Sequence, residues 1–262
     1  MSYTLATALI FLAFALAELA AGRFFNADRT TRKDLILETG SGLVLPGLVV
    51  PFIMVTSAHL AEAVVPDSAG RWSHWHPAVM FAVLLVADDL TQYLWHRASH
   101  ASPALYRLHR AHHSAEYMSV RITYRNNILY YAMMPGLWLS GLLVYWGFAP
   151  VYYVYLVAKM LVVVGAHSSV AWDEPLYRSR LGRPIMWVLE RLISTPATHA
   201  AHHGKHEADG VTWYHGNYGN FLFLWDVLFG TAKITRRRPQ VDGLENVQPA
   251  TWFEEWLWPS QR

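Results

Sequence analysis

Long apolar runs are the feature that most constrains how this chain folds. A helix needs about 20 predominantly apolar residues to cross the roughly 30 Å hydrocarbon layer of a bilayer. Runs that approach or exceed this length cover residues 4–21, 42–65, 77–95, 128–148 and 151–166. Only 15% of the residues are charged, against 53% that are hydrophobic. We therefore expect an all-α integral membrane protein with about four to five transmembrane helices.

The distribution of basic residues predicts the orientation of these helices. The first run has no positive charge before it, and a basic stretch from Arg23 to Lys33 follows it, which indicates a retained helix and not a signal peptide. The positive-inside rule places that stretch in the cytoplasm. Counting spans from there puts the ends of the third and fifth runs on the cytoplasmic side. We expect one membrane-embedded domain over residues 1–262 with a cytoplasmic, histidine-rich helical cap. The short outer loop and the lack of a targeting tail favour a bacterial inner membrane.

Histidines form a recurring pattern in the cytoplasmic segments. The chain has 14 histidines, and nine of them fall in HxxxH or HxxHH clusters or directly after the fifth run: His96, His100, His109, His112, His113, His167, His199, His202 and His203. Spacings of three and four residues put side chains on one face of a helix, where two imidazoles share one metal or hold two adjacent metals. The second histidine of each HH pair points about 100° away and could reach a second ion.

The number of these histidines indicates a binuclear metal site. A structural zinc ion takes four ligands, and a catalytic zinc ion takes three and a water, so nine candidates are too many for one zinc. Imidazole also suits iron, copper and nickel. The absence of cysteine excludes cysteine-ligated iron–sulfur clusters and disulfides. Two iron ions are favoured, since oxidation of an unactivated lipid C–H bond needs activated O2. Zinc is expected only as a substitute in purified protein.

Several motifs together resemble the fatty acid hydroxylase/sterol desaturase superfamily of membrane histidine-box di-iron enzymes. They are Asp89 followed by HRASH, then LHRAHHS, HSS, TPATHAAHH and NYGNFLFLWDVLFGT, and they span about residues 87–231. The resemblance implies that the nine histidines are the metal ligands. Members of the superfamily often supply a further ligand after the lone histidine, where this chain has Ala171. His206, His215 or a water would then complete the set.

Two further residues match positions of the superfamily. Asp89 lies seven residues before His96, about two helical turns, and we expect it to accept the free N–H of a ligating imidazole. Asn217 belongs to the NYG motif. It is either a hydrogen-bond partner of the ligands or a residue that caps and packs the C-terminal segment.

The predicted reaction is O2-dependent hydroxylation or desaturation of a lipid, such as an acyl chain, a sterol or an amino-lipid. The chain has no cysteine and no nucleotide-binding glycine motif, so an external ferredoxin-like or cytochrome b5-like donor with its reductase must supply electrons. A basic face could dock that carrier or bind anionic lipid headgroups, and it comprises Arg107, Arg110, Arg121 and Arg125. The net charge of +2 gives no indication of nucleic-acid binding.

A zinc-dependent membrane hydrolase or a metal-binding membrane protein is the alternative. Zinc hydrolases that hold their metal on a helix commonly place a general-base glutamate in an HExxH motif. This sequence has no such motif.

Overall fold

The computed structural model describes residues 3–245 and 248–258, and the regular structure in this part of the chain is helical apart from one isolated bridge between Gly204 and Asp242. The α-helices are α1 (Tyr3–Ala20), α2 (Arg32–Val44), α3 (Val50–Val64), α4 (Pro77–Leu84), α5 (Thr91–Ala101), α6 (Pro103–His113), α7 (Ile128–Ala132), α8 (Pro135–Leu143), α9 (Ala149–His167), α10 (Glu174–Arg178), α11 (Gly182–Leu192), α12 (Pro196–His203), α13 (Leu224–Phe229) and α14 (Trp252–Trp256). Three π-helical segments, η1 (Leu45–Val49), η2 (Leu85–Leu90) and η4 (Val144–Phe148), and two short 3₁₀ segments, η3 (Val120–Ile122) and η5 (Glu207–Asp209), complete the secondary structure.

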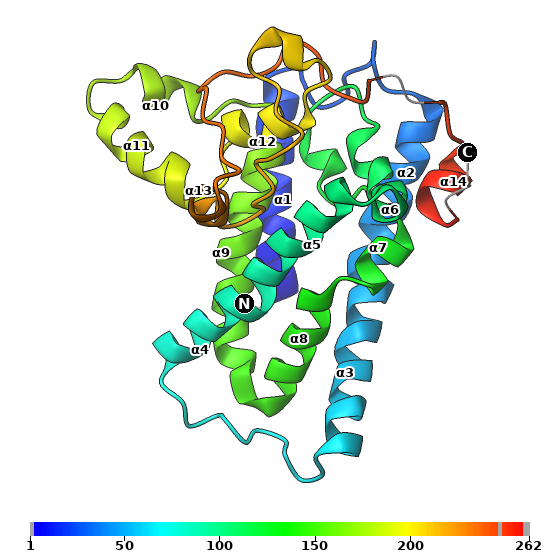
Figure 1. Cartoon of the computed structure of the whole chain (residues 1–262), viewed down its shortest axis with the longest axis vertical. Helices are drawn as coiled ribbons and strands as arrows, with labels where there is room; N and C mark the ends of the chain where they lie inside the picture. The colour runs from blue at the N-terminus through cyan, green and yellow to red at the C-terminus, as the bar shows by residue number, and fades with distance from the viewer. Residues whose placement is uncertain (1–2, 246–247, 259–262) are drawn as a thin grey trace.

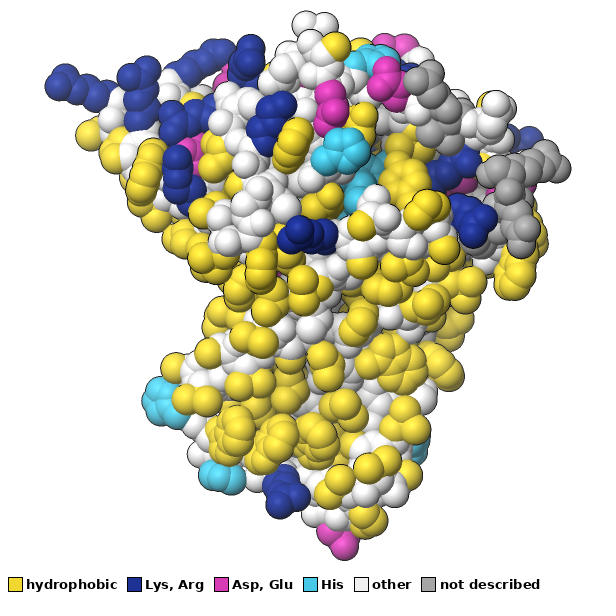
Figure 2. All heavy atoms as spheres, viewed as in Figure 1, with side chains coloured by type: hydrophobic (Ala, Val, Ile, Leu, Met, Phe, Trp, Pro, Cys, Tyr) yellow, Lys and Arg dark blue, Asp and Glu magenta, His cyan; other side chains and the backbone are white. Residues whose placement is uncertain are grey.

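The molecule has an apolar half and a polar half. Helices α3, α4 and α8 and the first turns of α9 make up the lower half in Figure 1, whereas α6, α10, α12 and α14 lie in the upper half. Figure 2 shows hydrophobic side chains over most of the lower half and gathers nearly all the charged ones in the upper half. This division is the one expected for a protein that is inserted in a bilayer by one end.

Three helical stretches are long and apolar enough to cross a membrane, namely Arg32–Val64, Pro77–Ala101 and Pro135–His167. A shorter apolar helix covers Leu5–Ala20. The prediction of an integral membrane protein with apolar helices is therefore confirmed, whereas the count of four to five spans is not.

The third stretch contains a reversal of the chain. Gly147 has φ +112°, and the chain turns back at this point between α8 and α9 in Figure 1. A side chain here would collide with the backbone of Ser73, since a Cβ atom would lie 2.7 Å from its nitrogen. Glycine therefore permits both the left-handed conformation and the close approach of the loop before α4.

The fourth apolar run is broken near its start. It was expected to be helical from residue 128, but α7 ends at Ala132 and α8 begins only at Pro135. Met134 is extended, because a residue before proline is disfavoured in the helical conformation.

A buried ion pair joins two of the apolar stretches. Lys159 Nζ of α9 lies 2.6 Å from Asp88 Oδ2 of η2, and Tyr155 donates to the same oxygen at 2.7 Å. The side chain of Asp88 is buried as well as paired. The pair fixes α9 against the stretch that leads into α5, and both carry predicted ligands at their ends.

Candidate metal centre

The nine predicted ligands lie together in two groups at the polar end of the apolar helices. Within each group, every histidine offers a nitrogen within 4.8 Å of those of the other members. The first group consists of His96, His100, His109, His113 and His202, and the second of His112, His167, His199 and His203. All are buried except His100, which is partly exposed. These groups are able to bind metal ions.

Helical spacing explains how each cluster is divided between the groups. His109 and His113 are four residues apart on α6 and share the first group, while His112 belongs to the second. On α12, His199 and His203 share the second group, and the histidine between them belongs to the first. Residues four apart lie one above the other on a helix, whereas adjacent residues diverge by about 100°. Each HxxHH motif therefore contributes to both groups.

Local sequence signals set where these helices begin and end. Pro103 follows an extended Ser102, so α5 ends directly after its last histidine and α6 starts at once. At α12, the Thr195 side chain accepts from the Thr198 backbone, and the Thr198 side chain accepts from the Thr195 backbone. This capping box holds the first turn, so that the three histidines of α12 follow in fixed register.

In four of the histidines, the Nδ1 nitrogen is hydrogen-bonded to a backbone carbonyl. The Nδ1 atoms of His96 and His202 lie 2.7 Å from the carbonyl oxygens of Tyr218 and Gly216. The same contact measures 2.7 Å from His167 Nδ1 to the Val163 oxygen and 3.2 Å from His112 Nδ1 to the oxygen of Arg125. A carbonyl only accepts, so Nδ1 carries the proton in each ring, and Nε2 is left with a lone pair.

These lone pairs converge on one another. His96 Nε2 lies 3.0 Å from His202 Nε2 in the first group, and His112 Nε2 lies 3.4 Å from His167 Nε2 in the second. Two unprotonated nitrogens at this distance repel each other, and a cation between them removes the repulsion. The donor set therefore fits two metal ions, one for each group.

Burial keeps the imidazoles neutral. It lowers the pKa of the six histidines on α6 and α12 well below the ordinary value of 6.5, and neighbouring imidazoles lower it further. A neutral imidazole is the form that binds a metal ion, so the site does not have to release protons from these side chains at neutral pH.

Comparison with known proteins agrees with this geometry. The model of the family described as "Fatty acid hydroxylase" matches residues 81–231, which is more than half of the chain. The chain belongs to the fatty acid hydroxylase family. All nine histidines fall within the matched residues.

Among curated members and relatives, ornithine lipid hydroxylase OlsE of Rhizobium tropici is 28% identical over 78% of this chain and 58% of its own. Alkylglycerol monooxygenase of Danio rerio is 24% identical, over 60% of this chain and 31% of its own length. Alkylglycerol monooxygenase of Homo sapiens is 28% identical, over 55% of this chain and 28% of its own length. This chain thus spans less than two thirds of each of these relatives. No solved structure matches it at a significant level.

Asp89 does not make the contact expected from its family position. Its Oδ2 accepts from Trp225 Nε1 at 2.8 Å and from the Leu222 backbone at 3.2 Å, and none of its hydrogen bonds to the described residues reaches a histidine. Seven residues equal two turns only in an α-helix, and the π-helical η2 has a wider turn. Asp89 is therefore rotated towards the C-terminal segment, and the backbone carbonyl of Tyr218 takes the place next to His96.

Asn217 connects the C-terminal segment to α12. Its amide nitrogen donates to the Thr198 oxygen at 2.9 Å and to the Lys233 oxygen at 3.0 Å. None of its side-chain hydrogen bonds to the described residues reaches a histidine. It lies between Gly216 and Tyr218, whose carbonyls hold His202 and His96. These contacts correspond to the second of the two predicted roles, a residue that caps and packs the C-terminal segment.

Neither candidate for a tenth ligand belongs to a group within the described residues. His206 is exposed and pairs with Glu245 at 2.9 Å. His215 lines a pocket of about 270 Å³ together with His100 and His113. Lys205, Tyr214 and Glu245 line the same pocket, which gives the first histidine group an opening to the polar half of the molecule.

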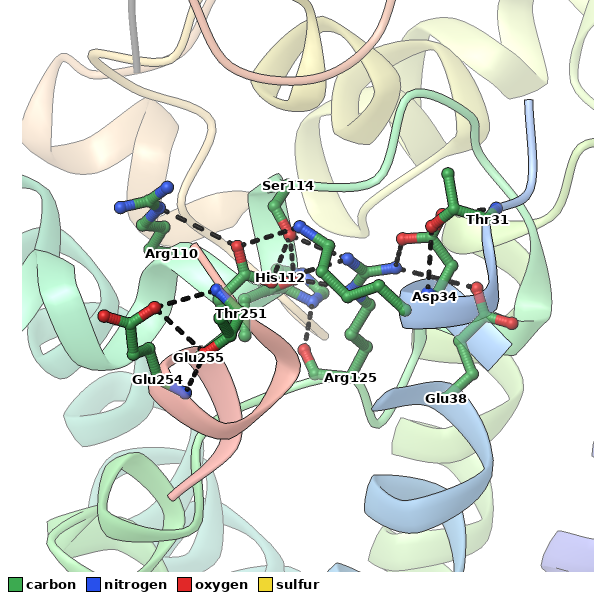
Figure 3. Close-up of polar contacts among 12 residues, drawn as sticks. Thr31, Asp34, Glu38, Arg110, His112, Ser114, Arg125, Thr251, Glu254 and Glu255 are labelled. Carbon is green, nitrogen blue, oxygen red and sulfur yellow. Dashed lines mark hydrogen bonds and ion pairs between the residues drawn. The ribbon is translucent and has the colours of Figure 1, made fainter. Parts of the chain in front are cut away.

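The prediction that Arg125 belongs to an exposed basic face is wrong, because this residue is buried. Arg125 is 0% exposed, and Figure 3 shows its guanidinium among acidic and hydroxyl side chains of α2, α6 and α14. It lies 2.5 Å from Asp34 Oδ1 and donates to Ser114 Oγ at 2.7 Å. Arg121 is turned inward as well and lies 3.4 Å from Glu38. These two side chains therefore hold the fold together and are not free to dock an electron carrier.

Sequence reasoning missed Asn126. His109 Nδ1 lies 3.2 Å from Asn126 Oδ1, and the backbone oxygen of Asn126 accepts from Ser41 of α2 at 3.2 Å. The sequence did contain an indication of this role, since Asn126 and Asn127 lie directly before an apolar run. A polar side chain that is buried next to such a run needs a hydrogen-bond partner.

Replacing Asn126 tests its role in orienting His109. Asn126→Leu removes the acceptor, and we expect metal affinity of the first group to fall by about 10- to 100-fold, as for other partners that orient a ligating imidazole. Asn126→Asp keeps an acceptor at the same place and should retain most of the metal. The measurement is metal content after dialysis against graded chelator, with folded protein verified by gel filtration. Equal retention by the Leu and Asp variants would contradict the role.

Proposed function

We propose that this protein is an O2-dependent, non-haem di-iron oxidoreductase that hydroxylates or desaturates a lipid in the membrane. The observation that carries the proposal is the arrangement of nine histidines in two adjacent, buried groups at one end of apolar helices. Membership of the fatty acid hydroxylase family supports the same class of reaction.

Each histidine group would hold one ion. The second group offers four histidines and the first offers five, so an ion in the second group would leave more room for an exogenous ligand or a water. Two irons supply what zinc lacks, the capacity to activate O2 for attack on an unactivated C–H bond. In a hydroxylation, one oxygen atom enters the lipid and the other leaves as water, with two electrons and two protons from outside.

The protein's own residues orient the ligands and keep the site dry. Carbonyl oxygens of Tyr218, Gly216, Val163 and Arg125 fix the imidazole tautomers, eight of the nine imidazoles are buried, and a pocket lies beside His100. A dry site protects a reactive oxidant from side reactions.

The location of the site and the names of the relatives support a lipid substrate. The histidines of α5 and α9 terminate helices that are apolar enough to lie in the hydrocarbon layer, so a chain of a membrane lipid can approach without leaving the bilayer. Relatives named for ornithine lipid and alkylglycerol support an amino-lipid or an ether lipid over a soluble substrate. An external ferredoxin-like or cytochrome b5-like donor would provide the electrons.

The membrane arrangement is part of the proposal. Five spans, α1, α2–α3, α4–α5, α8 and α9, would put the histidine end on the cytoplasmic side of a bacterial inner membrane, with residues 1–262 as one domain. The reversal at Gly147 supports counting α8 and α9 as separate spans.

Metal content and isotope transfer test the proposal together. Protein is grown with iron supplementation and purified anaerobically in nanodiscs, and iron and zinc are quantified in the same sample. We expect two irons per chain, one for each histidine group. Chemically reduced protein is then mixed with ¹⁸O2 and total membrane lipid. A lipid product with one ¹⁸O atom indicates hydroxylation, and a product that has lost two hydrogens and gained no oxygen indicates desaturation.

Zinc that persists after growth on iron, with no O2 consumption, would contradict the oxidoreductase and favour a zinc-dependent hydrolase. A single metal per chain would contradict the binuclear site.

A further inference from the structure

Helix α11 has an apolar face that the rest of the chain does not cover. Met186 and Glu190 are buried against the protein. Leu181, Ile185, Val188 and Leu192 recur at intervals of three and four residues and form a stripe on another face. This stripe is exposed, with Leu181 81% and Ile185 58% accessible. Four large aliphatic side chains would not remain in water on a stable surface without a partner.

Basic residues lie on a different side of the same segment. Arg178, Arg180, Arg183 and Arg191 lie within or just before α11, whereas the acidic residues of the same segment are engaged. Glu190 is buried and paired with Arg236 at 2.7 Å, and Glu174 pairs with Arg178. Among the described residues, neither Arg180 nor Arg183 has a carboxylate partner. The segment therefore presents unpaired positive charge beside an apolar stripe.

The apolar stripe continues onto the membrane half of the molecule. Helix α13 packs against α11 and exposes Leu228 at 63%, together with Val227 and Phe229. In Figure 1, α10 and α11 project sideways from the upper half, just above the apolar helices. In Figure 2, basic side chains lie along the upper edge of this projection, and hydrophobic ones lie below it, next to the apolar half.

We propose that α11 and α13 form an in-plane membrane contact, in which the apolar stripe enters the acyl boundary and Arg180 and Arg183 bind the phosphate groups of anionic phospholipids. An apolar face, an arginine-rich rim and a position at the edge of the hydrocarbon layer are the features of interfacial amphipathic helices. The occupant is the lipid of the membrane that already surrounds the apolar half. A second copy of the chain would cover the stripe but would leave the arginines without a negative partner.

This contact connects the membrane surface to the histidines. Within and beside α13, Trp225 donates to Asp89 at 2.8 Å, and Asp226 accepts from the Tyr218 backbone at 2.9 Å. The carbonyl of the same Tyr218 holds His96. The depth at which α13 lies therefore sets the depth of the segment that orients the first histidine group.

The absence of cysteine makes the test specific, because a single introduced cysteine is the only site for a thiol-reactive probe. Full-length Ile185→Cys carries an environment-sensitive fluorophore on the stripe, and Arg183→Cys carries the same fluorophore on the basic rim as the matched control. Both are reconstituted in phosphatidylcholine vesicles with and without phosphatidylglycerol. Two quenchers are compared, namely iodide in the water and phospholipids with a nitroxide on the acyl chain.

We expect the probe at position 185 to be quenched by nitroxide lipid and protected from iodide, and the probe at position 183 to show the reverse. Nitroxide phosphatidylglycerol should quench the probe at position 185 more strongly than nitroxide phosphatidylcholine. Replacing Arg180 and Arg183 with Gln in the Ile185→Cys protein should reduce this preference by about fivefold per arginine, the factor that corresponds to one basic residue near an anionic surface.

Three outcomes would overturn the proposal. Iodide quenching at position 185 that equals the quenching at 183 would mean that the stripe lies in water. Protection from both quenchers would mean that a second copy or another protein covers it. A phosphatidylglycerol preference that survives the two Gln substitutions would remove the arginines from headgroup binding.

Discussion

We expect His112→Ala and His202→Ala each to lose one metal ion and all turnover while the protein stays in the membrane. The two residues belong to different groups, so each variant retains an intact group beside a damaged one. Loss of a direct ligand should lower metal affinity by more than the roughly 10- to 100-fold that follows loss of an outer partner. We therefore expect metal content to fall from two ions to one in either variant, and O2-dependent lipid oxidation to become undetectable.

The control for these variants is His215→Ala. His215 lines the pocket beside His100 and His113 but belongs to neither group. It should keep both metals, so a general effect of removing a histidine near the site is separated from loss of a ligand. Metal content is measured by elemental analysis, and membrane insertion by extraction at alkaline pH. Near-normal turnover with both metals in His112→Ala or His202→Ala would mean that the ligand assignment is wrong.

The sequence was most informative where function needs helical spacing. The HxxxH and HxxHH intervals placed their histidines on helix faces, and the order of the apolar runs predicted that the separate clusters meet at one end of the helices, where they do lie together. How the histidines divide could not be deduced, because one HxxHH motif allows its members to share an ion or to serve two. The contacts between α5, α6, α9 and α12 decide this, and they put His112 and His113 in different groups.

The partners of the ligands were not predictable by the same reasoning. Asp89 looked like the acceptor for His96 under ideal helical geometry, but a π-helical segment changes the direction of its side chain. The actual acceptors are mostly backbone carbonyls, such as those of Gly216 and Tyr218, and a carbonyl leaves no signature in residue type. The break between the fourth and fifth apolar runs, by contrast, was visible in the sequence, and the chain reverses there at Gly147.

Arg125 illustrates how burial changes the meaning of a charged residue. In the sequence it belonged to a basic cluster that could meet a partner. In the fold, its guanidinium donates to the Ala111 carbonyl at 2.7 Å and lies 3.7 Å from Glu255 of α14, besides its contacts with Asp34 and Ser114. It joins α2, α6 and α14, and its own carbonyl accepts from His112 (Figure 3).

Arg125→Met should therefore be strongly destabilising. The substitution leaves the buried carboxylate of Asp34 without its cation, whereas Glu255 keeps Lys33 at 3.3 Å and Arg110 at 3.8 Å. Breaking a buried ion pair from one side costs about 3–5 kcal/mol. Arg125→Lys keeps the charge but not the planar guanidinium that donates to three acceptors. The stability of this variant should therefore lie between that of the parent protein and that of Arg125→Met. The measurement is the thermal unfolding midpoint in detergent, together with the metal content of each variant.

A second substitution separates loss of charge balance from loss of packing. Asp34 has the closest carboxylate to Arg125, at 2.5 Å. Asp34→Asn removes its charge, so the double variant Arg125→Met, Asp34→Asn should be more stable than Arg125→Met alone, even though Asp34→Asn destabilises the parent protein. Because the Arg125 carbonyl is present in every variant, metal should be retained wherever the fold recovers. If the double variant is no more stable than the single one, uncompensated charge is not the reason that Arg125 is required.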